Sequence, residues 1–216
     1  MSKAIQVYLE AGTKRTFAGA LDWPGWCRSG RTEEQALEAL SAYAERYAAV
    51  LKGAGLTFSS GAELKRLEVA ERLTGTPTTD FGAPGVAPSA DSAPLNDAAL
   101  AHQTALLVAA WEAFDMAASK ARGTRLSVGP RGGGRSVFKI VAHVADADEA
   151  YLGALGAKLP SGGDVRTAIL EALAAKVHGE PFAVPRKTQR PWSPRYVVRR
   201  SAWHALDHAW EMEDRS

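Results

Sequence analysis

The stretch from Thr74 to Pro94 constrains the fold of this chain most, because it separates two parts of different character. It is rich in proline, glycine, serine and threonine and has no hydrophobic periodicity, which is typical of a linker. Strand and helix patterns alternate before it, whereas every long segment after it has helical periodicity. We therefore expect two domains, residues 1–73 and 95–216, joined by a linker over residues 74–94. A chain of 216 residues is long enough for two modest hydrophobic cores.

The first residues of the chain have the pattern of two paired strands. Ala4–Glu10 and Phe17–Leu21 are rich in strand-forming residues, and the turn-like segment Ala11–Lys14 lies between them. Two such runs joined by a short turn predict a β-hairpin. We expect it to belong to an antiparallel sheet.

Two helices are expected to follow this hairpin. Thr32 stands three residues before Gln35 at the start of an apolar pattern, which predicts a capping box. The pattern continues with helical spacing to Leu51, so this helix should have one buried face. A second, more charged helix is expected over Ala62–Leu73. Together, the sheet and the helices predict a small α+β domain.

Four amphipathic segments follow the expected linker. Each has apolar residues at helical spacing, and each begins at a residue that commonly caps helices. The expected starts are Asn96 or Asp97, Ser136, Asp164 and Ser193, the last followed by proline in the first turn. Four helices of this length predict an all-α, up-down four-helix bundle.

Three histidines are placed where two of these helices can bring them together. His204 and His208 are four residues apart in the last helix, so they project from the same face. His143 lies beside the apolar stripe of the second helix. If the two helices pack face to face, the three imidazoles form a divalent-metal site with one position open for water or substrate. The alternative is that they are hydrogen-bonded core histidines without a metal.

The first fifty residues resemble the small α/β domain of HicB-like antitoxins. The similarity lies in an Asp-x-Pro-Gly turn and in the residues that start the following helix. The matching positions are Asp22, Pro24, Gly25, Gly30, Thr32, Glu33, Glu34 and Ala36. The resemblance implies a fold and self-association. It does not extend to a DNA-binding segment, because no helix-turn-helix or strand-helix repressor pattern follows.

The region from Leu95 onwards resembles the DinB-like four-helix bundles. Val137–Leu152 and Arg200–Glu213 look like the second and last helices of that superfamily, in which one histidine on the second helix joins an H-x-x-x-H pair on the fourth. His143, His204 and His208 match this motif residue by residue. The superfamily includes metal-dependent thiol transferases and isomerases. Because the sequence continues for only five residues after Glu211, we do not expect the extra C-terminal domain that some thiol-dependent members use to complete the active site.

The resemblance implies a cofactor and a reaction class. It implies a divalent metal, zinc or nickel, that activates a low-molecular-weight thiol such as mycothiol or bacillithiol for attack on a small electrophile. Such thiols carry carboxylates, so cationic side chains are expected to orient them. Arg195, Arg199 and Arg200 at the start of the last helix are the candidates. No catalytic residue is identified.

Composition limits the other possibilities. The formal net charge of +2 argues against nucleic acid as the partner. The single cysteine, Cys27, excludes an internal disulfide framework and suits a reducing cytoplasm. No stretch approaches the apolar length of a membrane span. Because both resembled families self-associate, we expect a homodimer that acts on a small-molecule substrate.

Two functional classes remain open at this point. One is a metal-dependent thiol transferase or isomerase. The other is a non-enzymatic binding or regulatory protein, in which the HicB-like domain mediates assembly and the metal site is structural or vestigial. Dependence of any reaction on a thiol would separate the two.

Overall fold

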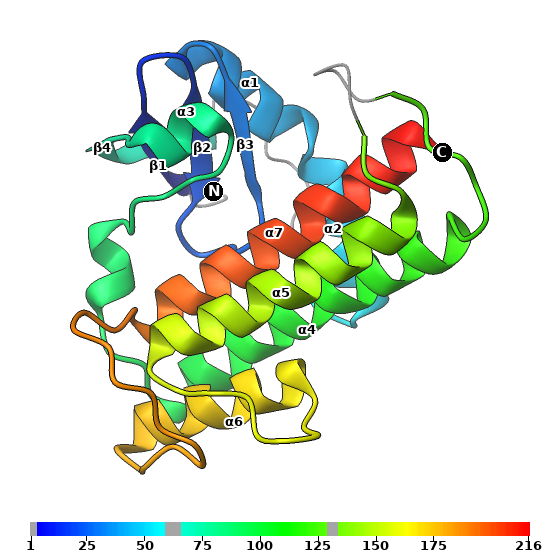
Figure 1. Cartoon of the computed structure of the whole chain (residues 1–216). Coiled ribbons are helices and arrows are strands. Elements are labelled where there is room, and N and C mark those ends of the chain that lie inside the picture. The colour runs from blue at the N-terminus through cyan, green and yellow to red at the C-terminus, as the bar shows by residue number, and fades with distance from the viewer. Residues whose placement is uncertain (1–3, 59–65, 129–133) are drawn as a thin grey trace. The chain divides into compact units, whose positions relative to one another are not determined.

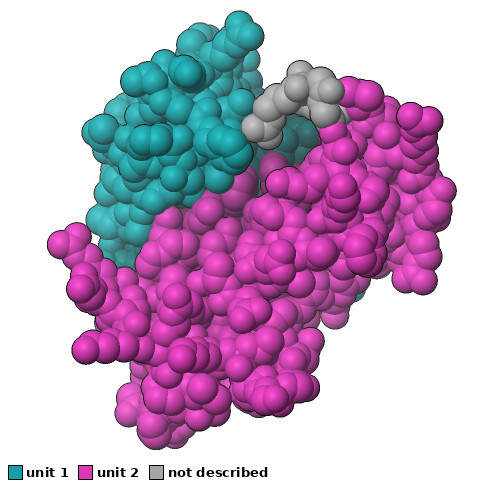
Figure 2. All heavy atoms as spheres, in the orientation of Figure 1, with its two compact units in different colours: residues 1–93 teal, residues 94–216 magenta. Residues whose placement is uncertain are grey.

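The computed structural model describes residues 4–58, 66–128 and 134–216, which form four strands and seven α-helices (Figure 1). Clustering of contacts divides the chain into two compact units, residues 1–93 and 94–216, here called the sheet unit and the helical unit (Figure 2). None of the helices among the described residues has the length and apolar character needed to cross a membrane.

A mixed four-stranded sheet organises the sheet unit. The predicted hairpin is confirmed, because β1 (Ile5–Ala11) pairs antiparallel with β2 (Thr16–Ala20). β3 (Cys27–Gly30) continues the sheet beyond β2, and β4 (Leu67–Thr74) pairs with β1 in parallel. The strand order is β3-β2-β1-β4. The expectation of a purely antiparallel sheet is therefore wrong at the β1–β4 edge.

The prediction of a helix over Ala62–Leu73 is also wrong for the part of this range that the structure describes. Residues 62–65 lie outside the described part of the chain, and β4 occupies Leu67–Thr74. Residues along β4 alternate between half-buried and exposed, as expected of an edge strand. Its glutamates and arginine favour helix locally, but the backbone pairing with β1 decides the conformation.

The helix expected from Thr32 to Leu51 is divided at Tyr43. α1 (Glu33–Ala42) ends there and α2 (Ala44–Gly53) begins directly after it. Thr32 caps α1 as predicted, since its hydroxyl accepts from the Gln35 N–H at 3.2 Å. The Gln35 side chain instead accepts from the N–H of Arg31, so the reciprocal bond of a capping box is not made.

The core of the sheet unit gathers around Trp26. This side chain is fully buried, and its indole N–H donates to the carbonyl oxygen of Leu40 at 2.9 Å. Its ring stacks against that of Tyr47, whose hydroxyl donates to the Pro24 carbonyl oxygen at 2.8 Å. The residues of the Asp-x-Pro-Gly turn therefore join α1 and α2 to the sheet.

The stretch expected to be a linker contains regular structure. It includes α3 (Pro77–Phe81) and the short 3-10 helix η2 (Ser89–Ser92). The fully buried Glu10 on β1 accepts from the hydroxyl of Thr79 and from the N–H groups of Gly85 and Val86. The carboxylate of one residue on β1 thus holds this segment, which belongs to the sheet unit.

Four helices form the helical unit: α4 (Asp97–Lys120), α5 (Val137–Leu155), α6 (Val165–His178) and α7 (Pro194–Arg215). The predicted caps Asn96, Ser136, Asp164 and Ser193 all accept from the N–H three residues later. α4 contacts α6 and α7, and α5 also contacts α6 and α7. The chain colours show that α5 runs opposite to α4 and α7 (Figure 1). Because α4 and α7 therefore run in the same direction, the expected up-down order is wrong for the last helix.

Candidate metal centre

Helices α5 and α7 position the three predicted histidines. Ser193 and Pro194 begin α7 well before the pair, so His204 and His208 lie in its regular interior, where four residues make about one turn. Ser136 begins α5 seven residues before His143. Because α5 and α7 are antiparallel neighbours, the early part of α5 lies beside the late part of α7.

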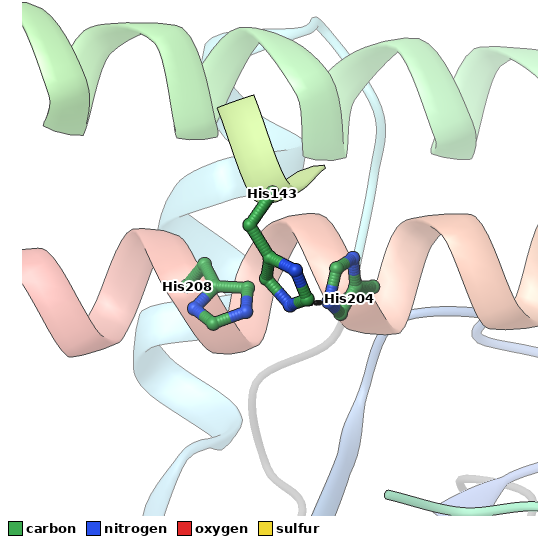
Figure 3. A group of neighbouring side chains, drawn as sticks. All are labelled: His143, His204 and His208. Atoms are coloured by element: carbon green, nitrogen blue, oxygen red, sulfur yellow. Dashed lines mark hydrogen bonds between the residues drawn. The ribbon is translucent and has the colours of Figure 1, made fainter. Parts of the chain in front are cut away.

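The three imidazoles converge on a common point. Figure 3 shows His143 directed from α5 toward His204 and His208 on α7. One ring nitrogen from each residue lies within 4.8 Å of the others. The Nε2 atoms of His143 and His204 are 3.2 Å apart. Two nitrogens bound at about 2.05 Å to one tetrahedral zinc ion are separated by about 3.3 Å, so this pair already has a suitable spacing.

A hydrogen-bonded relay orients His208. Its Nδ1 lies 2.7 Å from Glu211 Oε2, and Arg215 donates from Nη1 to the other carboxylate oxygen of Glu211. Arg215 also donates from Nε to the Ser127 carbonyl oxygen at 2.8 Å. The hydrogen bond from His208 is the main cause of the lowered pKa of Glu211. An ionised Glu211 accepts a hydrogen bond from the Nδ1–H of His208, so the lone pair of Nε2 is available to a metal.

The environment of the other two histidines favours their neutral form. Burial is the main cause that lowers the pKa of His204 to about 2, and the nearby His208, His143 and Arg200 add to it. The pKa of His143 is lowered chiefly by burial and then by Arg135. A metal ion binds the unprotonated imidazole nitrogen, so these ligands need no deprotonation at neutral pH.

Of the three candidate arginines, Arg200 interacts electrostatically with the histidine cluster. Its charge is one of the causes that lower the pKa of His204. Arg195 lies at the start of α7 and has the Pro94 carbonyl oxygen 3.5 Å from its Nη2. Arg199 is buried at 5% exposure. The sequence predicted all three as a set, and the structure places Arg200 where its charge acts on His204.

Sequence reasoning missed a buried acid close to this region. Asp148 on α5 is 1% exposed, and neither carboxylate oxygen has a hydrogen-bond partner of good geometry in the described residues. Burial raises its pKa to about 7, although Arg166, Ser201 and Trp111 act in the opposite direction. The signal was present in the sequence, because Asp148 interrupts an otherwise apolar stripe four residues after Val144.

The remaining histidines lie outside the group. His178 ends α6, and its Nε2 is 3.0 Å from Asp97 Oδ1 in an exposed pair. His102 is exposed on α4. Neither belongs to the cluster that can hold a metal ion among the described residues.

Comparisons with known proteins identify no relative of this chain. The chain matches no family model, no curated protein and no solved structure. Similarity to the DinB-like and HicB-like families therefore stays a prediction based on the residues named above. The observation on which function can be argued is the convergence of His143, His204 and His208.

Proposed function

We propose that the protein is a metal-dependent enzyme of the DinB-like superfamily that transfers or isomerises small electrophiles with a low-molecular-weight thiol. In this proposal α4–α7 are a four-helix bundle and residues 1–73 a HicB-like domain. The observation that carries the proposal is that three imidazole nitrogens from two helices lie within 4.8 Å of one another. Three protein ligands leave a fourth position of a tetrahedral ion for a thiol or substrate.

The donor set fits zinc or nickel. Imidazole nitrogen is a common ligand of both ions. His204 is held neutral by burial, and Glu211 orients His208 from the side away from the cluster. When bound, such a metal lowers the pKa of a coordinated thiol and so favours the nucleophilic thiolate at neutral pH.

The aromatic residues around His204 would then exclude water from the bound metal. His204 is 7% exposed, and the rings of Tyr151 and Trp203 lie beside it at centroid distances of 6.1 and 5.9 Å. These aromatic side chains lower the local dielectric, which strengthens electrostatic interactions with a bound anion. The only described cysteine, Cys27, is buried in the sheet unit, so the proposal requires the nucleophilic sulfur to come from a bound thiol.

Three parts of the proposal rest on the sequence. A single cysteine suits a cytoplasmic location. Self-association in the two resembled families suggests a homodimer, and the thiol chemistry requires a small-molecule substrate. The competing proposal is a binding or regulatory protein that retains the metal without turnover.

Metal binding by matched variants tests the ligand set. We expect the parent protein to bind one equivalent of zinc and His204→Gln to bind it more than about 100-fold less tightly, because loss of an outer-shell partner alone costs about 10- to 100-fold. His178→Gln is the control, since this histidine lies outside the cluster. Isothermal titration and elemental analysis are the measurements. Full metal content in His204→Gln would overturn the assignment.

Thiol-dependent turnover separates the two functional classes. The zinc-loaded parent is incubated with bacillithiol, mycothiol or glutathione and a generic electrophile such as chlorodinitrobenzene. Conjugation that requires the thiol and disappears in His204→Gln supports the enzyme. Stoichiometric zinc binding without conjugation by any of these thiols favours the binding or regulatory protein.

A further inference from the structure

Arg200 lies one helical turn before His204, where it contacts aromatic side chains on both helices. Its guanidinium carbon is 5.5 Å from the ring centroid of Tyr151 on α5 and 4.9 Å from that of Trp203 on α7. Its Nη2 donates to the Tyr151 hydroxyl oxygen at 3.3 Å. The aromatic rings thus hold the guanidinium on the side of the histidine cluster nearest the start of α7.

The charge of Arg200 has no acidic partner in the described residues. The residue is 7% exposed, and its Nε and Nη1 atoms are buried without a hydrogen-bond acceptor. Leaving a buried cation unpaired is costly, and guanidinium groups pair best with planar anions such as carboxylates. The acid buried nearby, Asp148, does not fill this role, because Arg166 is the cation that acts on it.

Tyr151 adds a second polar group to the same place. Its hydroxyl oxygen accepts from Arg200, so its own proton remains available to an anion. A phenol keeps this proton near neutral pH. The ring of Trp192 stacks on that of Tyr151 at 5.5 Å and fixes its orientation.

We propose that Arg200 and the Tyr151 hydroxyl bind a carboxylate of one of the small molecules that react at a metal held by His143, His204 and His208. This proposal rests on the proposed function, because it requires a metal at the histidines. The four residues from Arg200 to His204 rise about 6 Å along α7. Arg200 and a metal at His204 are therefore close enough for small molecules to reach both. The carboxylate belongs either to the thiol or to the second substrate.

Cobalt(II) replaces zinc in the test, because a bound thiolate gives a charge-transfer absorption with cobalt. The probes are β-mercaptopropionate and its neutral amide, which differ in charge but not in length. We expect the parent to bind the acid about tenfold or more tightly than the amide, since a charge-assisted hydrogen bond contributes that much. In Arg200→Met this preference should disappear while cobalt binding is retained. Arg122→Met is the control, because this arginine is exposed after the end of α4, and it should keep the preference.

A second titration identifies which substrate carries the carboxylate. Propionate is added to the cobalt protein saturated with the amide, and its binding is followed by calorimetry. Arg200-dependent binding of propionate, without a preference for the acid thiol, assigns the carboxylate to the second substrate and supports the proposal.

The possible failures are distinguishable. A parent protein that binds no cobalt overturns the proposed function and this proposal together. The other failure overturns this proposal alone. In that case cobalt binding and thiolate absorption are normal, the acid and the amide bind with equal affinity, and Arg200→Met does not change the binding of propionate.

Discussion

The buried acid Asp148 makes the stability of the helical unit depend on pH in a direction opposite to that of an ordinary carboxylate. In the folded protein its pKa is raised to about 7, mainly by burial, from the usual 3.8. Between these values the folded state keeps a proton that the unfolded state releases, so the free energy of unfolding falls as pH rises. The two pKa values differ by about three, and each pKa unit corresponds to about 1.4 kcal/mol, so the loss approaches about 4 kcal/mol.

Asp148→Asn should remove this dependence. Asparagine has the shape of the protonated acid and can bond to the nearby Ser201 and Trp111 without a charge. We expect the variant and the parent to have similar free energies of unfolding near pH 4, whereas near pH 8 the variant should be more stable by about 4 kcal/mol. Comparing the two proteins at each pH cancels the titration of all other groups that the substitution leaves unchanged.

Urea unfolding followed by far-ultraviolet circular dichroism measures this difference, because α4–α7 contribute most of the helix. Parent and variant are compared in the same buffers across the range from about pH 4 to about pH 8. Stability curves that run parallel over this whole range would refute the reasoning. That result would mean that the carboxyl of Asp148 is solvated or paired in solution.

Three further predictions concern Glu211, His204 and Glu10. Glu211→Gln should weaken zinc affinity by about 10- to 100-fold in calorimetry, because it removes the carboxylate that orients His208; unchanged affinity would exclude this role. Lowering the pH of the metal-free protein from about 7 to about 5 should reduce the free energy of unfolding by about 2 kcal/mol. The cause is His204, because its imidazole gains a proton below pH 6.5 in the unfolded chain but not in the folded protein. His204→Leu should lose that acid sensitivity in urea titrations, and if it does not, other groups cause it. Glu10→Leu should destabilise the sheet unit by about 3 kcal/mol, measured by tryptophan fluorescence, because the Gly85 and Val86 N–H groups lose their acceptor; a change within error would show that water replaces the carboxylate.

The helices of the C-terminal half could be predicted almost completely from the sequence. Asn96, Ser136, Asp164 and Ser193 each cap a helix as expected. Capping and hydrophobic periodicity act over a few residues, so a single sequence records them directly. The i,i+4 spacing of His204 and His208 is local in the same sense, and it places both side chains on one face without knowledge of any other helix.

Interactions between distant segments could not be predicted in the same way. Leu67–Thr74 contains residues that favour helix, and it is a strand because β1 offers it a parallel partner sixty residues away. Thr79 and Gly85 lie in a segment of linker-like composition, yet the buried Glu10 orders them. In both cases the deciding hydrogen bonds join residues far apart in the chain.

The sequence by itself determined the position of each helix in the C-terminal half and the residue types available for a metal. Only the tertiary structure decided what surrounds the histidines: Arg215 bound to the Ser127 carbonyl oxygen, Arg200 against Tyr151, and the burial of Asp148. The physical reason is that backbone conformation follows from short-range preferences. Burial, pairing and pKa depend instead on which helices pack together, and a single sequence does not record that packing.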